Sequence, residues 1–402
     1  MGNNDNNGKG MKFSKAVNRI MPAAIVIMLL ISVCYLVAGQ MLLVNDRGVS
    51  SGDSQCLDHY FEVKREDGGY ESITIPGTYE QYGDGELVLT TELTPNVIDE
   101  WLMIWNMGHV LNVYIDDELR SAVNIDGRRL FKGYMVYQFD FVRLKESDTG
   151  KTLSIHFPEY ANENHQLGSV YTGDKASLLL RAIRPYQFSL VLGLVMVAVG
   201  IITIVRVRVL PRKDERAYEL FYMSAGVTFA SAWFLFNSPA AQFLFPNIET
   251  AKDCAFFFAS MIALPFLMYI GRLLKGRYAV SLSVLKILAV ISYLILTVGF
   301  FFTDFSINDL FIPTEITDVA SLGVTLAILT GDIQSRRIRE YYLAAVGLVG
   351  FVALALIYVI LFILFPFRGD GGAVLMLGIV LLYFTSMGSY FKNKVRGRKP
   401  SA

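Results

Sequence analysis

Eight long apolar runs constrain the fold of this chain more than any other feature of its sequence. A helix needs about 20 apolar residues to cross a hydrocarbon layer of roughly 30 Å. Such a helix also satisfies its own backbone hydrogen bonds, which lipid cannot do. We therefore predict a membrane protein with eight spanning helices. The predicted spans are approximately 22–44, 186–205, 218–238, 253–274, 281–302, 314–333, 341–365 and 372–391.

The first apolar run follows a basic lead, residues 1–21, as a signal peptide would. Its apolar stretch is longer than the 7–15 residues that are usual in cleaved signals. We therefore expect 22–44 to be an uncleaved transmembrane anchor. The small residues of LVAG, 36–39, keep cleavage open as an alternative.

Basic residues that flank the spans predict the orientation, because cytoplasmic loops are enriched in lysine and arginine. With the N-terminus inside, the outside loops hold only Lys252 and Arg368 after residue 185. We expect a multi-pass protein of the cell (plasma) membrane with both termini in the cytoplasm. The predicted inside loops and tail hold Arg206, Arg208, Arg212, Lys213, Arg216, Arg272, Lys275, Arg277, Arg336, Arg337, Arg339, Lys392, Lys394, Arg396, Arg398 and Lys399.

The segment between the first two spans, 45–184, is predicted to be an extracytoplasmic β domain. Apolar and polar residues alternate in 111–116, 134–141 and 152–157, as in strands with one buried face. Asp116 to Glu118 is predicted to form a hairpin turn. Many short strands in a segment of this length favour an antiparallel sandwich or jelly roll. Further strands are expected near 59–64, 71–75, 86–92, 101–105, 119–124 and 177–183.

The expected organisation has five parts. These are a cytoplasmic basic segment at 1–21, the anchor at 22–44, the sensor-like β sandwich at 45–184, a seven-helix transmembrane domain at 185–391 and a cytoplasmic basic tail at 392–402.

This layout resembles the bacterial seven-transmembrane receptors with diverse intracellular signalling modules. The β segment adds local resemblance in SITIPG (72–77), LMIWN (102–106), VYIDDELR (113–120) and KTLSIHF (151–157). In that family such segments are core strands of a carbohydrate-module-like sensor domain. The resemblance covers nearly the whole chain, and it lies in the architecture more than in any single motif.

The resemblance implies a receptor that reads an external ligand and drives a cytoplasmic output, often a diguanylate cyclase, histidine kinase or phosphatase. Here the sequence departs from the family, because only KNKVRGRKPSA follows the last predicted span. Such a stub is too short to fold as a catalytic domain. We therefore expect the output module to be missing here or to be supplied by a separate signalling partner. Homodimers are plausible in such a family, but no residue pattern requires one.

Candidate ligand residues lie in the β segment. Trp105 and Tyr134 could stack on the apolar faces of a sugar, together with Trp101 and Tyr137. The alternative is that aromatic residues on one strand face simply fill the sandwich core. The predicted ligand-binding set is Trp105, Asn106, His109, Arg128 and Tyr134.

Two cysteines and two acids are further candidates. Cys56 and Cys254 fall outside or at the outer membrane edge, where a disulfide can persist. The alternative is two thiols too far apart to meet disulfide geometry. Glu315 and Asp318 share one helix face and could line an outer cavity. The alternative places both in the first turn after Pro313, where acids complement the helix dipole.

No motif indicates an enzyme, a cofactor or a metal site. The chain lacks HExxH, Walker A, CxxC and GxSxG sequences. Its four histidines, at 59, 109, 156 and 165, show no ligand spacing. The balance of 36 basic and 36 acidic residues gives no reason to expect nucleic-acid binding.

Three functions remain from the sequence. The first is a receptor that binds a small extracytoplasmic ligand, such as a carbohydrate, and relays the signal through the lipid-embedded helices. The second is a transporter or channel with an accessory external domain, but polar residues at mid-span are few. The third is an envelope-assembly protein whose β domain binds another protein.

Overall fold

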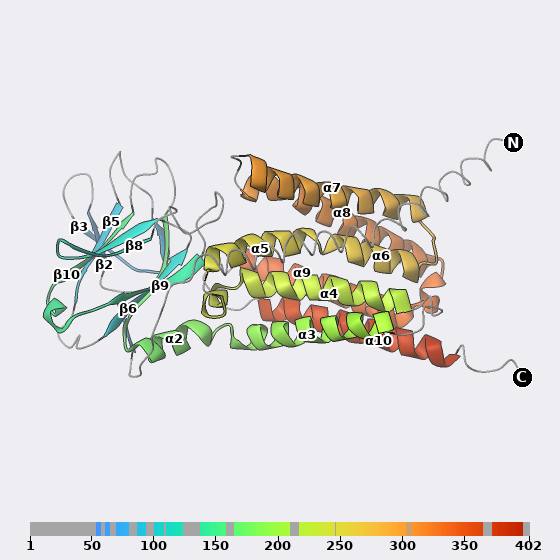
Figure 1. Ribbon diagram of the computed structural model, residues 1–402, viewed down its shortest axis with the longest axis horizontal. Helices are drawn as coiled ribbons and strands as arrows, with labels where there is room; N and C mark the ends of the chain where they lie inside the picture. Colours follow the sequence, from blue (N-terminus) through green and yellow to red (C-terminus); the bar gives the residue numbers. More distant parts are fainter. Residues whose placement is uncertain are drawn as a thin grey trace, which may run out of the picture. The chain divides into compact units, whose positions relative to one another are not determined.

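The computed structural model divides the chain into two compact units, which we describe separately (Figure 1). The β unit contains Gly39–Gln187 and a second segment, Pro239–Thr250. The helical unit contains the other residues. The structure describes residues 54–57, 61–64, 70–79, 87–93, 100–107, 110–123, 137–157, 165–209, 217–245, 247–303, 305, 307–364 and 372–396.

Among the described residues of the β unit, eleven strands form two antiparallel sheets. The first sheet has the order β1-β11-β6-β9, with β4 paired to β11, and the second has the order β3-β2-β5-β10-β7-β8. The strands are β1 Ser54–Cys56, β2 Phe61–Lys64, β3 Tyr70–Ile73, β4 Gly77–Tyr79, β5 Leu87–Glu92, β6 Trp101–Met107, β7 Leu111–Ile115, β8 Glu118–Val123, β9 Tyr137–Arg143, β10 Thr152–Phe157 and β11 His165–Gly173.

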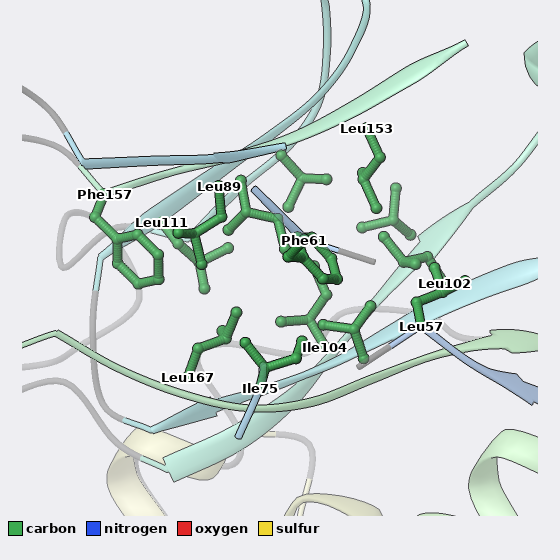
Figure 2. Close-up of a cluster of buried hydrophobic side chains, with 14 of the residues drawn as sticks. Leu57, Phe61, Ile75, Leu89, Leu102, Ile104, Leu111, Leu153, Phe157 and Leu167 are labelled. Atoms are coloured by element: carbon green, nitrogen blue, oxygen red, sulfur yellow. The ribbon is translucent and has the colours of Figure 1, made fainter. Parts of the chain in front are cut away.

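One apolar core lies between the two sheets, as Figure 2 shows. Strands β7 and β10 point alternate side chains into it, so the alternation predicted for 111–116 and 152–157 is confirmed. Leu102 and Ile104 of the opposite sheet face the same core and are fully buried. Burial on this scale stabilises the unit by roughly 25 cal/mol per Å² of apolar surface removed from water.

The predicted hairpin turn at Asp116 is also confirmed. Strands β7 and β8 are joined by Asp116 and Asp117 alone. Asp116 has φ +50°, a left-handed conformation that aspartate tolerates better than most residues. Its carboxylate accepts a hydrogen bond from the Thr152 amide at 3.0 Å, which fixes the turn to β10.

The prediction of a strand at 177–183 is wrong, because these residues form helix α2, Lys175–Ile183. Asp174 caps the helix by accepting hydrogen bonds from the amides of Ala176 and Ser177. The capped first turn, the apolar face at helical spacing and the helix propensity of alanine and leucine favour a helix over a strand here. The last strand is instead β11, in which Gly168 obscures the alternating pattern.

A buried ion network closes one loop of the β unit. The Asp148 side chain is completely buried and accepts from Arg120 Nη2 at 2.8 Å and from the Lys145 amide at 2.7 Å. Burial by itself would raise the pKa of Asp148. The Lys145 amide, the Lys151 ammonium and the Arg120 guanidinium outweigh this effect and hold that pKa below its usual value.

In its described part, the helical unit contains six helices that are long and apolar enough to cross a membrane. They correspond to six of the eight predicted spans, while the anchor at 22–44 lies outside the described residues. The remaining span corresponds to α9, which is apolar throughout. The helices are α3 Gln187–Val209, α4 Ala217–Asn237, α5 Ile248–Ser260 with α6 Ala263–Leu273, α7 Ala279–Phe302, α8 Ile307–Gln334, α9 Tyr342–Leu364 and α10 Gly372–Arg396.

One span is broken in the middle, close to Pro265. Helix α5 ends at Ser260 and α6 begins at Ala263. A proline ring clashes with the carbonyl four residues earlier, here that of Met261. The amides of Met261 and Ile262 accordingly bond to the carbonyls three residues before them.

Candidate functional site

The aromatic residues of β6 form a second apolar layer on the outer face of its sheet. Trp101, Met103 and Trp105 alternate with Leu102 and Ile104, which point into the core. The alternative prediction that these tryptophans fill the sandwich core is therefore wrong. The two faces of a strand are distinct, and Leu102 and Ile104 occupy the inner one.

Helix α2 covers part of this outer layer. The Lys175 ammonium lies 4.4 Å from the centroid of the Trp101 ring, and the Arg181 guanidinium lies 4.4 Å from that of Tyr171. Both are cation–π contacts, and Lys175 is buried. Burial and the nearby Asp174 raise the pKa of Glu100, just before β6.

The segment between α4 and α5 covers another part of the layer. It contains the 3-10 helix η2, Pro239–Phe243, and belongs to the β unit. The Phe243 ring stacks on Phe139 at a centroid distance of 6.1 Å and meets the edge of Phe141 at 6.4 Å. Phe139 in turn stacks on Trp105. An aromatic chain therefore runs from β6 to η2.

Gln242 fixes this segment to the edge of the sheet. Its Oε1 accepts from the Phe139 amide at 2.7 Å, and its Nε2 donates to the Phe139 carbonyl at 3.0 Å. Among the described strands, β9 is the last in its sheet, so the Phe139 amide and carbonyl on that edge are available to Gln242. The carboxamide pairs with both, as a neighbouring strand would. The sequence contained no pattern that assigned 239–250 to the β unit.

The two predicted ligand residues that the structure describes, Trp105 and Asn106, do not face the same side of the sheet. Trp105 and Asn106 are neighbours on a strand and therefore lie on opposite faces of the sheet. Asn106 is fully buried on the core side, opposite Gln138, whose side chain donates to Asp140 at 2.8 Å. His109, Arg128 and Tyr134 lie outside the described residues. A role of these three residues in sugar binding stays a prediction.

The acids on α8 lie deeper in the helix than the sequence indicated. Helix α8 begins at Ile307, so Pro313 is inside it and Glu315 is in its third turn. The prediction that both acids complement a first-turn dipole is therefore wrong. Glu315 is exposed and Asp318 is half-buried, while Ser292 of α7 bonds to Thr317 at 2.9 Å on another face of α8.

Lys252, which the sequence placed in an outside loop, and Asp253, at the start of the predicted span 253–274, are both buried in α5. Helix α5 begins at Ile248, before the predicted start of that span, and Lys252 and Asp253 are both inaccessible. The Lys252 ammonium donates to the carbonyl of Asn237, the last residue of α4, and thereby caps that helix. The sequence signal for the early start was Asn247, whose side chain accepts from the Thr250 amide.

The buried carboxylate of Asp332 connects three chain segments at the end of the helical unit where α6 and α8 end. The Asp332 side chain is completely buried. Its Oδ2 lies 3.2 Å from Arg277 Nη1, in the turn between α6 and α7, and accepts from the Tyr341 hydroxyl at 2.7 Å. We call these three residues the Asp332 cluster.

The cysteine and histidine predictions remain open. Cys56 is exposed on β1 and Cys254 is buried in α5, in different units, so their disulfide stays a prediction. The His156 ring contacts Tyr114 at a centroid distance of 4.5 Å on the second sheet. Within the described ranges, no three His, Cys, Asp or Glu side chains are grouped as a metal site would require.

Comparisons with known proteins place the chain in no family. No protein-family model matches the sequence. No curated protein is similar to it.

Proposed function

We propose that this protein is a transmembrane signal receptor whose β sandwich senses an extracytoplasmic ligand. One observation carries the proposal. The segment that links α4 to α5, residues 239–250, is folded as part of the β unit, through Gln242 and Phe243. A rearrangement of the outer face of that sheet would therefore act on the ends of two membrane helices through a short covalent connection.

The aromatic layer is a suitable relay because it is packed on both sides. Gly168 lies so close to the Trp105 ring that a Cβ atom there would be 2.7 Å from it. A change in the position of Trp105 would therefore displace β11 at Gly168. Through the stacked Phe139 ring, it would also displace Phe243 of η2. A ligand shifts this equilibrium only if it binds one arrangement more tightly than the other.

The finer parts of the proposal follow from the resemblance and the sequence. We infer that the sandwich is a jelly roll, that 22–44 is a further membrane helix and that the sandwich lies outside the cell membrane. A carbohydrate or cell-wall fragment is the proposed ligand class. The output module is supplied by a cytoplasmic partner or by a domain beyond this sequence.

The test uses the full chain in lipid nanodiscs and follows thermal unfolding with simple sugars, peptidoglycan fragments, amino acids and divalent metals. A ligand that binds only the native state stabilises it by RT ln(1 + [L]/Kd), about 2.7 kcal/mol at a hundred times Kd. The receptor proposal expects a saturable increase in the unfolding temperature with one class.

A second measurement separates sensing from mere binding. Hydrogen exchange in α4 and α5 should change when that ligand binds, and the change should be lost in a Gln242→Ala variant that still binds it. Leu244→Ala is the matched control, because Leu244 is an exposed neighbour in the same segment. Folded protein that responds to none of these ligands would favour a protein-binding role for the sandwich.

A further inference from the structure

The Asp332 cluster lies where four helices end or begin. Helices α6 and α8 end there, and α7 and α9 begin there. The carboxylate of Asp332 joins the turn after α6 to the start of α9 through Arg277 and Tyr341. One side chain therefore restrains the relative positions of these ends.

Backbone strain is concentrated in the two turns that the cluster connects. Four non-glycine residues in the described part of the chain have a left-handed backbone. Three of them are Lys275 and Tyr278, beside Arg277, and Arg336, between α8 and α9. Such conformations persist only where the surrounding contacts enforce them. The turns therefore favour a different geometry if those contacts are lost.

The orientation of Arg277 depends on both the turn and Asp332. Its Nε donates to the Leu274 carbonyl at 3.2 Å, at the end of α6. Its Nη2 is buried and makes no hydrogen bond with any described residue. The guanidinium is thus incompletely satisfied in this arrangement. A guanidinium that is one-quarter exposed (25% of its side-chain surface) and has one buried nitrogen without a partner among the described residues is suited to a contact that can open.

We propose that the Asp332 cluster is a latch that holds the ends of α6, α7, α8 and α9 in one of two arrangements. Release of Asp332 from Tyr341 and Arg277 lets the strained turns relax and lets the basic 3-10 helix η3, Arg337–Glu340, whose two arginines are already exposed, move relative to the ends of these helices. This inference rests on the proposed receptor function, because it assigns to that receptor the element that a signal would move. The latch itself requires no particular ligand.

The test measures how often the helix ends held by the Asp332 cluster open in the absence of a ligand. A negative result would therefore refute the latch without bearing on the ligand screen that tests the receptor function. Leu282 is fully buried in the first turn of α7, next to this end of α6. A Leu282→Cys reporter is introduced into full-length protein whose three native cysteines are replaced. Its reaction rate with a water-soluble maleimide reports how often the end of α7 opens. A Leu264→Cys reporter, fully buried within α6, reports general loosening.

Tyr341→Phe removes one hydrogen bond to the carboxylate and leaves the charge pair and the ring in place. We expect about a tenfold faster reaction at Leu282→Cys, as for loss of a hydrogen bond to a charged group, and no change at Leu264→Cys. Tyr342→Phe is the control, because Tyr342 is its exposed neighbour. Asp332→Asn should accelerate the reaction further.

Two results would overturn the latch. One is a rate at Leu282→Cys that neither Tyr341→Phe nor Asp332→Asn changes. The other is an equal increase at both reporters, which would make Asp332 a purely structural residue.

Discussion

Replacement of Gln242 tests whether the segment between α4 and α5 is held by the β unit. Gln242→Ala removes two hydrogen bonds, to the amide and the carbonyl of Phe139, at 2.7 and 3.0 Å. At a net contribution of about 1 kcal/mol each, the β unit should lose about 2 kcal/mol. For a unit of about 160 residues this lowers the unfolding temperature by roughly 4–8 °C.

Hydrogen exchange provides a local readout of the same change. The Phe139 amide donates to Gln242, so its exchange should accelerate by roughly thirtyfold for 2 kcal/mol. Leu244→Ala leaves both hydrogen bonds in place and should match the wild type in temperature and exchange. If Gln242→Ala behaves like Leu244→Ala in both assays, Gln242 does not hold the segment 239–250 on the β unit. A change in the β unit would then have no route through Gln242 to α4 and α5.

Two further predictions concern stability. Asp148→Asn should destabilise the β unit by about 3 kcal/mol, because the buried Arg120 guanidinium would keep only the exposed Glu118 as a charge partner. Glu118→Gln is the control and should have little effect in urea unfolding, because the Glu118 side chain is exposed. Since the pKa of Asp148 is lowered by folding, its contribution should be complete above the unfolded pKa of about 4 and lost as the pH falls through the folded pKa. A destabilisation by Asp148→Asn that stays constant below pH 3 would contradict this. Gly347→Ala should lower the unfolding temperature of the helical unit, because its Cβ would collide with a hydroxyl of α10, while Gly323→Ala, in open space, should not; equal effects would refute the close packing of α9 on α10.

Local patterns predicted the parts of the fold that local physics controls. Alternation at Leu111, Val113 and Ile115 predicted an inward strand face, because strand geometry fixes which side chains share a face. Apolar length predicted six of the spans. The break between α5 and α6 was predictable because the effect of Pro265 is confined to its own helix turn.

Predictions failed where a longer-range contact decided the outcome. Alternation on β6 could not show which face, that of Leu102 or that of Trp105, lies toward the second sheet. Both faces are apolar, since the outer one packs against α2 and η2. The grouping of Trp105 with Asn106 is a different case, because strand geometry alone puts two neighbouring residues of β6 on opposite faces.

By itself, the sequence determined that this chain has an antiparallel β region and a set of apolar helices, because both follow from the spacing of apolar residues along the chain. Only the tertiary structure assigned Gln242 to the edge of β9 and brought Arg277, Asp332 and Tyr341 together. Gln242 is 103 residues from Phe139, and Arg277 is 55 from Asp332. Contacts between residues so far apart in the sequence depend on how the helices and strands pack against one another. The local spacing of apolar residues does not predict that packing.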